Sequence, residues 1–246
     1  MKAGLGPTSA QLAALVRRGI EFPPGLAAPR SARRSAREAA ILILFGEATS
    51  VPLVGRSEPG SKGSRGPGRG LPPGGSDLLL LRRTDNLSHH PGQIAFPGGG
   101  KDPSDADATA AALREAQEET QLDPASVAVT GELGRVFLPN SNNLVTPVLG
   151  TWESRPTLVP DGLETAEVFR VPTLELLDPE NRRTVVVPAQ ELRETRPRYQ
   201  GPGFQLGPQF GGSLVWGFTA MVMDSLFAEL GWEREWDKER TVGLQL

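Results

Sequence analysis

Short apolar runs, each bounded by glycine, proline or polar residues, recur along most of the chain and predict a sheet-rich fold. Runs of this length and setting are typical of buried strands. AAILILFG is short, apolar and β-branched in part, and DLLLLRR contains four consecutive leucines. The expected strands are 39–46, 77–83, 127–137, 144–153, 166–172 and 183–188.

Helical spacing of apolar positions occurs at both ends of the chain. A first helix is expected from Thr8 or Ser9 to Arg18, with Gly19 as its stop. A late helix is expected over 213–231, with Ser213 as cap and Gly231 as stop. We assign the apolar stripe of this late helix to core packing, and Trp216 beside it as well. The stripe consists of Val215, Phe218, Val222, Leu226 and Leu230.

A third, Ala-rich helix is expected in the middle of the chain. Asp105 is its predicted N-cap, and Thr120 is near its end. Strands combined with one central and one late helix fit an α/β fold, an α/β/α sandwich around a mixed sheet. We therefore divide the chain into an N-terminal helix and linker (1–37), a main domain (38–230) and a C-terminal tail (231–246). Within the domain, 55–77 is almost wholly Gly, Pro, Ser and charge, which predicts a flexible loop insertion.

Composition restricts the chemistry. The chain has 246 residues, no cysteine and a net charge of −3, so disulfides, thiolate metal sites and a cysteine nucleophile are excluded. No general electrostatic attraction to nucleic acid or to an anionic membrane is expected. No apolar run approaches the roughly 20 residues that span a bilayer. Any phosphate-bearing ligand must therefore be held locally, by a metal or by a few basic groups.

The stretch ALREAQEET, residues 112–120, places Glu115, Glu118 and Glu119 within an arc of roughly 100° on the central helix. Like charges at this spacing repel, and an acidic solvated face is the simplest interpretation of such a stretch taken alone. A run of three glycines at 98–100, however, lets a backbone carbonyl approach a cation held by the helix. Mg²⁺ prefers oxygen ligands of this kind, and a bound metal would relieve the repulsion.

Two adjoining motifs carry a resemblance to a known family. GKDPSDADATAAALREAQEETQL, residues 100–122, resembles the Nudix box, G-x5-E-x7-R-E-U-x-E-E-x-G-U with U apolar. Ala106 stands where the box has Glu, and Gln121 where it has Gly. The matching positions are Gly100, Arg114, Glu115, Ala116, Glu118, Glu119 and Leu122.

The preceding stretch, residues 78–99, resembles the signature of the coenzyme A pyrophosphatase branch, roughly LLTxRSxxxRxxxGxxxFPGG. Leu81 and Ser88 depart from it, and LVWGFTAMV at 214–222 is also similar to this branch. The matching positions are Arg83, Thr84, Gly92, Phe96, Pro97, Gly98 and Gly99. The resemblance spans about residues 38–228.

The resemblance implies a role for each matching position. Glu115, Glu118 and Glu119 would bind Mg²⁺ or Mn²⁺ together with the Gly100 carbonyl, while Arg114 would orient the carboxylates and Gly98 and Gly99 would allow close approach. A further carboxylate from a later loop would act as ligand or base. Glu164 is the candidate, with Glu167 behind it. The substrate-binding candidates are Arg83, His89 (or its neighbour His90) and Phe96.

Arg82 and Arg83 alternate in direction along a strand, so only one of them can face the ligand, and we favour Arg83 as a bidentate phosphate contact. At Ala106, a Glu on a continuous helix would point away from Glu115. If the helix instead starts near Asp107, position 106 lies in the loop, and the expected role of a Glu there is to hold Arg114. Asp105 or Asp107 could then take over that ion pair.

The implied function is metal-dependent hydrolysis of the diphosphate linkage of coenzyme A or its derivatives, giving a phosphopantetheine and adenosine 3′,5′-bisphosphate. Water would be the nucleophile. Two alternatives stay open: a Nudix enzyme for another nucleoside diphosphate derivative, such as a dinucleotide or oxidised nucleotide, and a non-catalytic nucleotide-binding scaffold. The expected partner is a small molecule, not nucleic acid or a membrane, and the oligomeric state is left open between monomer and homodimer.

The preference for Arg over Lys suggests a GC-rich bacterial genome, and we expect a cytoplasmic location, although the Arg-rich first 37 residues keep a transit peptide open.

Overall fold

The computed structural model of the protein describes residues 7–20, 22–23, 35–47, 76–152, 157–188 and 199–244. All but the last two residues of the loop expected at 55–77 lie outside these ranges. None of the helices in the described part of the chain has the length and apolar character needed to cross a bilayer.

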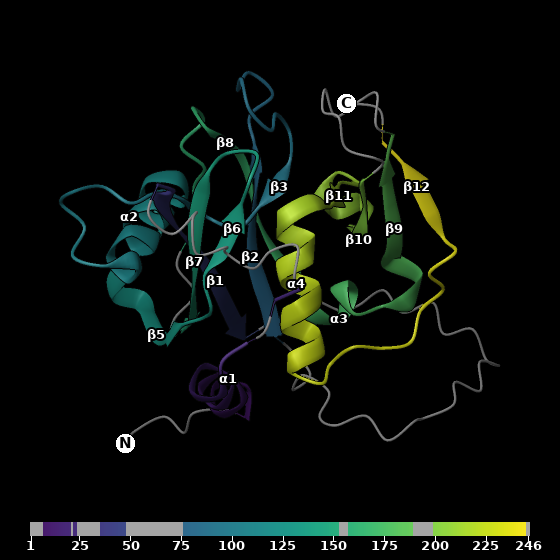
Figure 1. The fold of residues 1–246 in the computed structure, drawn as a ribbon, viewed down its shortest axis with the longest axis horizontal. Coiled ribbons are helices and arrows are strands. Elements are labelled where there is room, and N and C mark those ends of the chain that lie inside the picture. The colour runs from purple at the N-terminus through teal and green to yellow at the C-terminus, as the bar shows by residue number, and fades with distance from the viewer. Residues whose placement is uncertain are drawn as a thin grey trace.

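The centre of the described fold is an eight-stranded mixed sheet (Figure 1). Five strands follow the order β3-β2-β1-β7-β5, while β4 pairs with β1, β6 with β7 and β8 with β2. The β1–β7 pair is parallel and the other pairs are antiparallel. The strands are β1 (Arg37–Glu47), β2 (Ser76–Arg83), β3 (Ile94–Ala95), β4 (Gly98–Gly100), β5 (Val127–Glu132), β6 (Val136–Leu138), β7 (Asn143–Trp152) and β8 (Thr165–Pro172).

The central strand β1 is buried on both faces, because its residues alternate between two cores. Leu42 and Leu44 pack on one face, against the alanines of helix α2 (Ala108–Thr120). Ile41 and Ile43 pack on the other face, in a core that includes residues of α1 (Pro7–Arg18) and α4 (Gly217–Glu229). Figure 1 shows α2 and α4 on opposite sides of the sheet. The predicted α/β/α sandwich around a mixed sheet is confirmed.

Beyond α4 lies a four-stranded sheet of order β11-β10-β9-β12, which the sequence did not predict as a unit (Figure 1). Helix α4 is apolar on the sides that face both sheets, and Phe227 makes an edge-to-face contact with Phe204 of β10. The strands are β9 (Arg182–Val187), β10 (Tyr199–Gln205), β11 (Leu214–Val215) and β12 (Thr241–Gly243). The short helical turns are α3 (Thr173–Leu176) and three 3-10 turns, Pro124–Ser126, Pro179–Asn181 and Pro208–Phe210.

The late helix starts later than predicted. It begins at Gly217, so Ser213 is not its cap, and Trp216 occupies the capping position. Leu214 and Val215 instead pair with β10 as a short strand, and Gly217 turns the chain with a φ of 65°. The predicted stop at Gly231 is confirmed, with a φ of 68°.

The strand expected over 127–137 is two strands, because Gly131 (φ 150°) lies at a register shift that ends β5 at Glu132.

Both segments outside the predicted main domain pack against it. Leu12 and Leu15 of α1 are fully buried, and the helix begins at Pro7 and ends before Gly19, the predicted stop. On the C-terminal side, Trp232 is 1% exposed in the core, and β12 pairs in parallel with β9. The domain boundaries at 37 and 231 stay predictions, but the described parts of the flanking segments are packed elements and not free extensions.

Candidate active site

Helix α2 carries the predicted carboxylates, and its start corrects one expectation. Asp107, not Asp105, is the N-cap, since its Oδ1 accepts a hydrogen bond of 2.7 Å from the Ala110 amide. Asp107 has the extended backbone that a cap requires, whereas Asp105 lies two residues earlier, in the preceding loop. The helix thus starts near Asp107, and Ala106 is exposed in the loop before it. Position 106 therefore lies in the loop, the arrangement in which a carboxylate there was expected to hold Arg114.

Arg114 is the centre of a polar network on α2. Its Nε and Nη2 donate to Oδ1 and Oδ2 of Asp105 at 3.1 and 3.0 Å, a bidentate pair. The same guanidinium reaches Oε1 of Glu115 at 3.1 Å, Oε2 of Glu118 at 2.9 Å and the Gly100 carbonyl at 2.9 Å. The hydrogen bonds from Arg114 hold the pKa of Asp105 below its usual range, and those to Asp105 raise the pKa of Arg114. Arg114 therefore touches the Gly100 carbonyl and two of the three predicted metal-binding carboxylates, as the orienting role expected of it requires.

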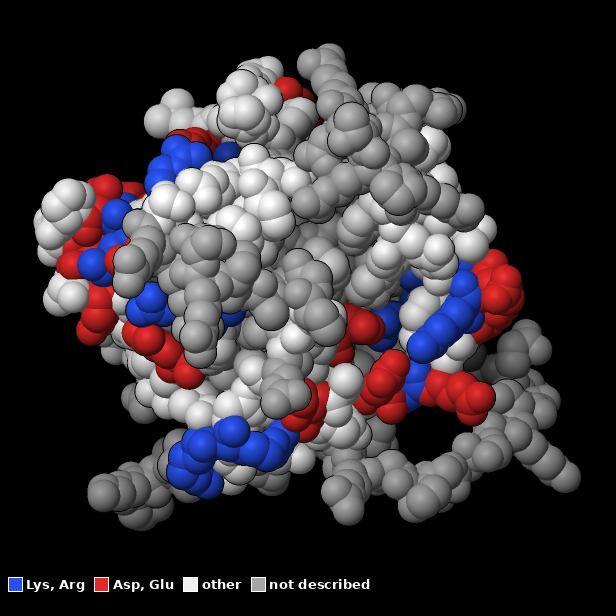
Figure 2. All heavy atoms as spheres, viewed as in Figure 1, with Lys and Arg blue, Asp and Glu red and all other residues white. Residues whose placement is uncertain are grey.

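Figure 2 shows acidic and basic side chains interleaved on the α2 side of the molecule, at the left of the view.

Glu119 is the most buried of the three carboxylates, at 5% exposure. Its Oε2 accepts a hydrogen bond of 2.9 Å from the Gly98 amide. Burial raises the pKa of Glu119 to about 8; the Gly98 hydrogen bond and Arg83 oppose the rise, while Glu115 and Glu164 add to it. Burial also raises the pKa of Glu115. Burial therefore disfavours the charged form of both carboxyls, and a nearby positive charge would favour it.

Gly98 and Gly99 are needed because backbone and carboxyl groups press against them. Gly98 has a φ of 153°, and a Cβ there would lie 2.3 Å from the Ala40 carbonyl. A Cβ on Gly99 would lie 2.5 Å from the Glu115 carboxyl. Gly100 has open space around it, and its contribution is its carbonyl oxygen, which accepts from Arg114.

Glu164 lies close to the carboxylates, as its predicted role requires. Its charge acts on both Glu115 and Glu119, and its Oε2 lies 3.7 Å from Nη2 of Arg83. Arg83 in turn acts on Glu119, so the four side chains share one electrostatic environment. Glu164 is exposed at its end, with 61% of the side chain open to solvent.

Asp161 is a positioning residue that the sequence reasoning missed. Its Oδ1 accepts from the amides of Leu163, Glu164 and Thr165 at 3.1, 3.1 and 2.8 Å. Its own amide donates to the Glu119 carbonyl at the end of α2. The Asp161-Gly162 pair is a recognisable turn signal, and it could have pointed to this loop.

Arg82 and Arg83 separate as the strand alternation predicts. Arg82 donates to Glu167 at 2.8 Å and to Asp85 at 2.9 Å. Glu167, the second candidate for the base, is therefore already paired with Arg82. Arg83 instead lines the cavity described next.

A cavity of about 200 Å³ lies beside β4, on the α4 side of the sheet. It brings together Arg83, Phe96 and the three glycines of β4, all from the two motifs. His89 is not among its lining residues: it is exposed in the turn that follows Asp85, where His90 has a φ of 56°. The remaining lining residues are Ala39, Ala40, Ile41, Ala95, Leu138, Asn143, Val145, Phe218 and Thr219.

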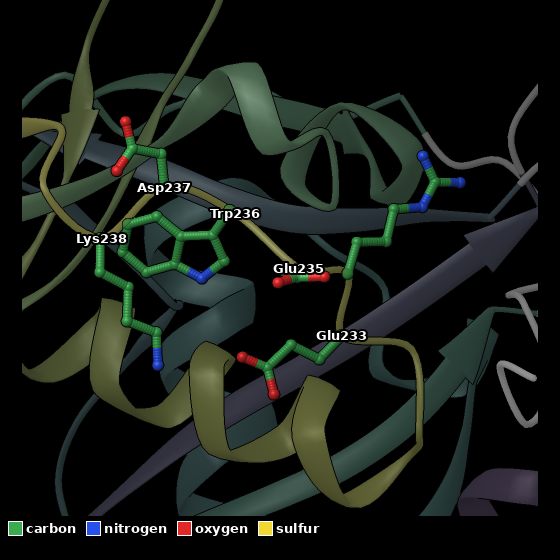
Figure 3. Close-up of a pocket in the computed structure, with 6 residues that line it drawn as sticks. Glu233, Glu235, Trp236, Asp237 and Lys238 are labelled. Carbon is green, nitrogen blue, oxygen red and sulfur yellow. The ribbon is translucent and has the colours of Figure 1, made fainter. Parts of the chain in front are cut away.

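A larger hollow of about 610 Å³ lies elsewhere, along six consecutive residues from Glu233 to Lys238 (Figure 3). Trp236 and Lys238 stand over α4 in this view, and no residue of α2 or β4 contributes. One surface segment folded over a helix is a shallow depression, and nothing in it converges on a reacting group. The smaller cavity is the candidate substrate pocket: none of the three glutamates of α2 lines it, and it shares with them the glycines of β4.

The residues present fit a divalent cation. All donors are oxygens, from three carboxylates and a carbonyl, which suits Mg²⁺ or Mn²⁺ and not a soft metal. Among the described residues no three acidic or histidine side chains already converge on one point, because Arg114 holds Glu115 and Glu118. Glu118 has 58% of its side chain exposed and can rotate toward a cation without repacking the core.

Comparison with known proteins identifies the family of the chain. Residues 67–187 match the family model of the NUDIX domain. The chain is 44% identical over 103 residues to mouse peroxisomal coenzyme A diphosphatase NUDT7, across 42% of this chain and 43% of that protein. The match thus spans less than half of the mouse protein.

Bacterial proteins match over more of their length. Nudix hydrolase NudL of Photorhabdus laumondii, named as uncharacterized, is 36% identical over 151 residues, which cover 61% of this chain and 74% of that protein. NudL of Pectobacterium atrosepticum, also named as uncharacterized, is 37% identical over 154 residues, which cover 62% and 74%.

Proposed function

The chain belongs to the Nudix hydrolase family, and on that premise we propose that it hydrolyses the diphosphate linkage of coenzyme A or its derivatives. The products would be a phosphopantetheine and adenosine 3′,5′-bisphosphate. One observation carries the proposal: the branch-specific stretch 78–99 and the carboxylate helix meet at Gly98–Gly100. The similarity to a coenzyme A diphosphatase over 103 residues supports the same substrate class.

The cation site would be formed by Glu115, Glu118, Glu119 and the Gly100 carbonyl. A bound Mg²⁺ or Mn²⁺ supplies charge neutralisation on the diphosphate and acidifies a water. A cation here would compete with Arg114 for Glu115, Glu118 and the Gly100 carbonyl, while the bidentate pair with Asp105 would keep the guanidinium beside the site.

Arg83 and Glu164 provide the remaining chemistry. The Arg83 guanidinium lies at the edge of the cavity, where its N–H groups can donate to non-bridging oxygens of the diphosphate. Glu164 accepts a proton from the attacking water, since its carboxylate is exposed and is held near Glu119 by the Asp161 turn. Water adds to one phosphorus, the bridging P–O bond breaks, and the leaving phosphate carries the electron pair away.

The departure at Ala106 does not favour a non-catalytic scaffold. The job expected of a carboxylate there, holding Arg114, is done by Asp105, whose side chain is 6% exposed and bidentate. The cytoplasmic location and the oligomeric state expected from the sequence stay predictions.

The test is a substrate panel with purified protein, Mg²⁺ or Mn²⁺, and products identified by mass. Coenzyme A should be cleaved with kcat/KM at least about tenfold above that for ADP-ribose or NADH, a difference of about 1.4 kcal/mol in transition-state binding. An inverted ranking would favour the dinucleotide alternative. A folded, metal-binding protein that hydrolyses no member of the panel would favour the binding scaffold.

A further inference from the structure

The cavity beside β4 has walls that the hydrolysis described above does not use. Most of its lining is apolar and comes from both sides of the α4 core, with Ile41 and Val145 from the sheet and Phe218 from the helix. Its volume of about 200 Å³ lies below the roughly 300–1,000 Å³ of pockets that enclose a whole drug-sized ligand. It therefore accommodates one arm of a large substrate and not the whole molecule.

Two neutral polar side chains interrupt the apolar wall. Thr219 lies in the first turn of α4 and is only 6% exposed, yet its hydroxyl makes no hydrogen bond with any described residue. Asn143 begins β7, and strand alternation places its side chain on the same side as Val145. Its amide likewise has no hydrogen-bond partner within the described residues. Both side chains line the cavity with hydrogen-bonding capacity that no described residue uses, so they are available to a ligand that enters it.

The charge of the cavity distinguishes the two arms of the proposed substrate. Arg83 is the one charged side chain among the described residues that line it, and it stands at the end near Glu119 and Glu164. The nucleotide arm of coenzyme A carries an additional 3′-phosphate, which needs cations of its own. The other arm has no charge beyond the diphosphate and offers methyl groups, amides and a hydroxyl. The apolar wall with two neutral hydrogen-bonding groups is complementary to that arm.

We propose that this cavity binds the uncharged pantetheine arm of the substrate, with Asn143 and Thr219 hydrogen-bonded to its amide or hydroxyl groups. The inference rests on the proposed function, and it names which half of the substrate the cavity selects. Arg83 then marks the boundary between the arm and the diphosphate. Asn143 lies outside the stretches that carry the family resemblance, whereas Thr219 lies within 214–222, and the fold brings the two together from β7 and α4.

The test combines three substrates with single and double variants, Thr219→Val and Asn143→Leu. Coenzyme A and 3′-dephospho-coenzyme A both carry the arm, whereas ADP-ribose lacks it. The double variant should raise KM at least about tenfold for the first two, leave kcat within about twofold, and leave ADP-ribose kinetics unchanged. Thr219→Ser keeps the hydroxyl and should behave as the unaltered protein. Thr241→Val, an exposed Thr of β12 outside the cavity, is the control for loss of a hydroxyl.

A binding measurement separates this inference from the proposed function. Calorimetry with 4′-phosphopantetheine should show at least about tenfold weaker binding to the double variant, while affinity for adenosine 3′,5′-bisphosphate stays the same. If coenzyme A is not hydrolysed but this selective loss is found, the proposed function fails and the cavity assignment stands.

Equal losses for ADP-ribose or adenosine 3′,5′-bisphosphate would assign the cavity to the nucleotide arm and overturn the proposal. Unchanged kinetics and binding in the folded variants would also overturn it. If the double variant does not fold, the comparison of Thr219→Val with Thr219→Ser decides by the same criteria.

Discussion

Arg114 donates two hydrogen bonds to Asp105, a residue that lies outside the helix and does not cap it. The two aspartates that flank Ala106 thus divide the work: Asp105 holds the arginine and Asp107 starts the helix. From the sequence alone, Asp105 was expected to cap the helix, and the ion pair with Arg114 was left open between Asp105 and Asp107. This division makes the two positions separable by experiment.

Asp105→Ala should impair activity through Arg114, because the freed guanidinium keeps Glu115 and Glu118 as partners and competes with the cation. We expect kcat/KM to fall about tenfold and the metal concentration needed for half-maximal rate to rise. Adding Ala106→Glu should restore much of the loss, since a carboxylate there can hold Arg114. A double variant no better than Asp105→Ala would remove the bracing role.

Asp107→Ala should affect stability and not chemistry. It removes the side-chain acceptor for the Ala110 amide, and loss of an N-cap costs about 1 kcal/mol. Denaturant unfolding should show this loss while kcat stays within about twofold. Asp107→Asn keeps a capping oxygen and should be close to neutral.

Glu119→Gln should lower kcat by at least about 10²-fold with the fold intact, because the site loses a charge that the cation needs. Gln keeps an oxygen that can accept from the Gly98 amide, so the packing of β4 should be unchanged. Near-normal turnover in this variant would exclude Glu119 from the site.

The pH dependence of the metal-free protein follows from the same residue. Its folded pKa of about 8 is above the value of an unfolded Glu, so the folded state binds the proton more tightly. The stability from this proton is fully present below about pH 4 and is lost as pH rises through about 8. Unfolding in the presence of a chelator should therefore show stability falling over this window, by at most about 1.4 kcal/mol per pH unit for one proton. Glu119→Gln should flatten the profile, and equal slopes in the two proteins would contradict the assignment.

Gln121→Gly should stabilise the protein. Gln121 ends α2 with a φ of 55°, a left-handed conformation that costs a non-glycine residue roughly 1–2 kcal/mol. The greater freedom of Gly in the unfolded chain offsets part of this gain, which leaves about 0.5–1 kcal/mol. Gln117→Gly is the matched control: it lies exposed inside α2 and should destabilise by about 1 kcal/mol. A destabilised Gln121→Gly would show that the side chain contributes contacts that offset its strain.

Local signals accounted for most of what the sequence predicted correctly. The carboxylates and glycines of the site lie in contiguous motifs, and the strands of the main sheet are apolar enough to be recognised singly. Position 161 was missed because its function depends on a hydrogen bond to the end of a helix far away in the chain. The strand Tyr199–Gln205 was missed because YQGPGFQ is rich in Gly and Pro, and its identity comes from pairing with β9. His89 is exposed and does not line the cavity, so its substrate-binding role stays a prediction.

The loop that carries Glu164 is attached to the last turn of α2 by two amides, those of Val159 and Asp161, which donate to the carbonyls of Thr120 and Glu119. These carbonyls belong to the helix end, where no further turn would use them. The carboxylates and Glu164 are thereby joined to one rigid body, so a displacement of α2 carries the loop with it. Small motions of the sheet would therefore leave the spacing between Glu164 and the carboxylates of α2 unchanged. On heating, we expect turnover to be lost when the C-terminal end of α2 unfolds.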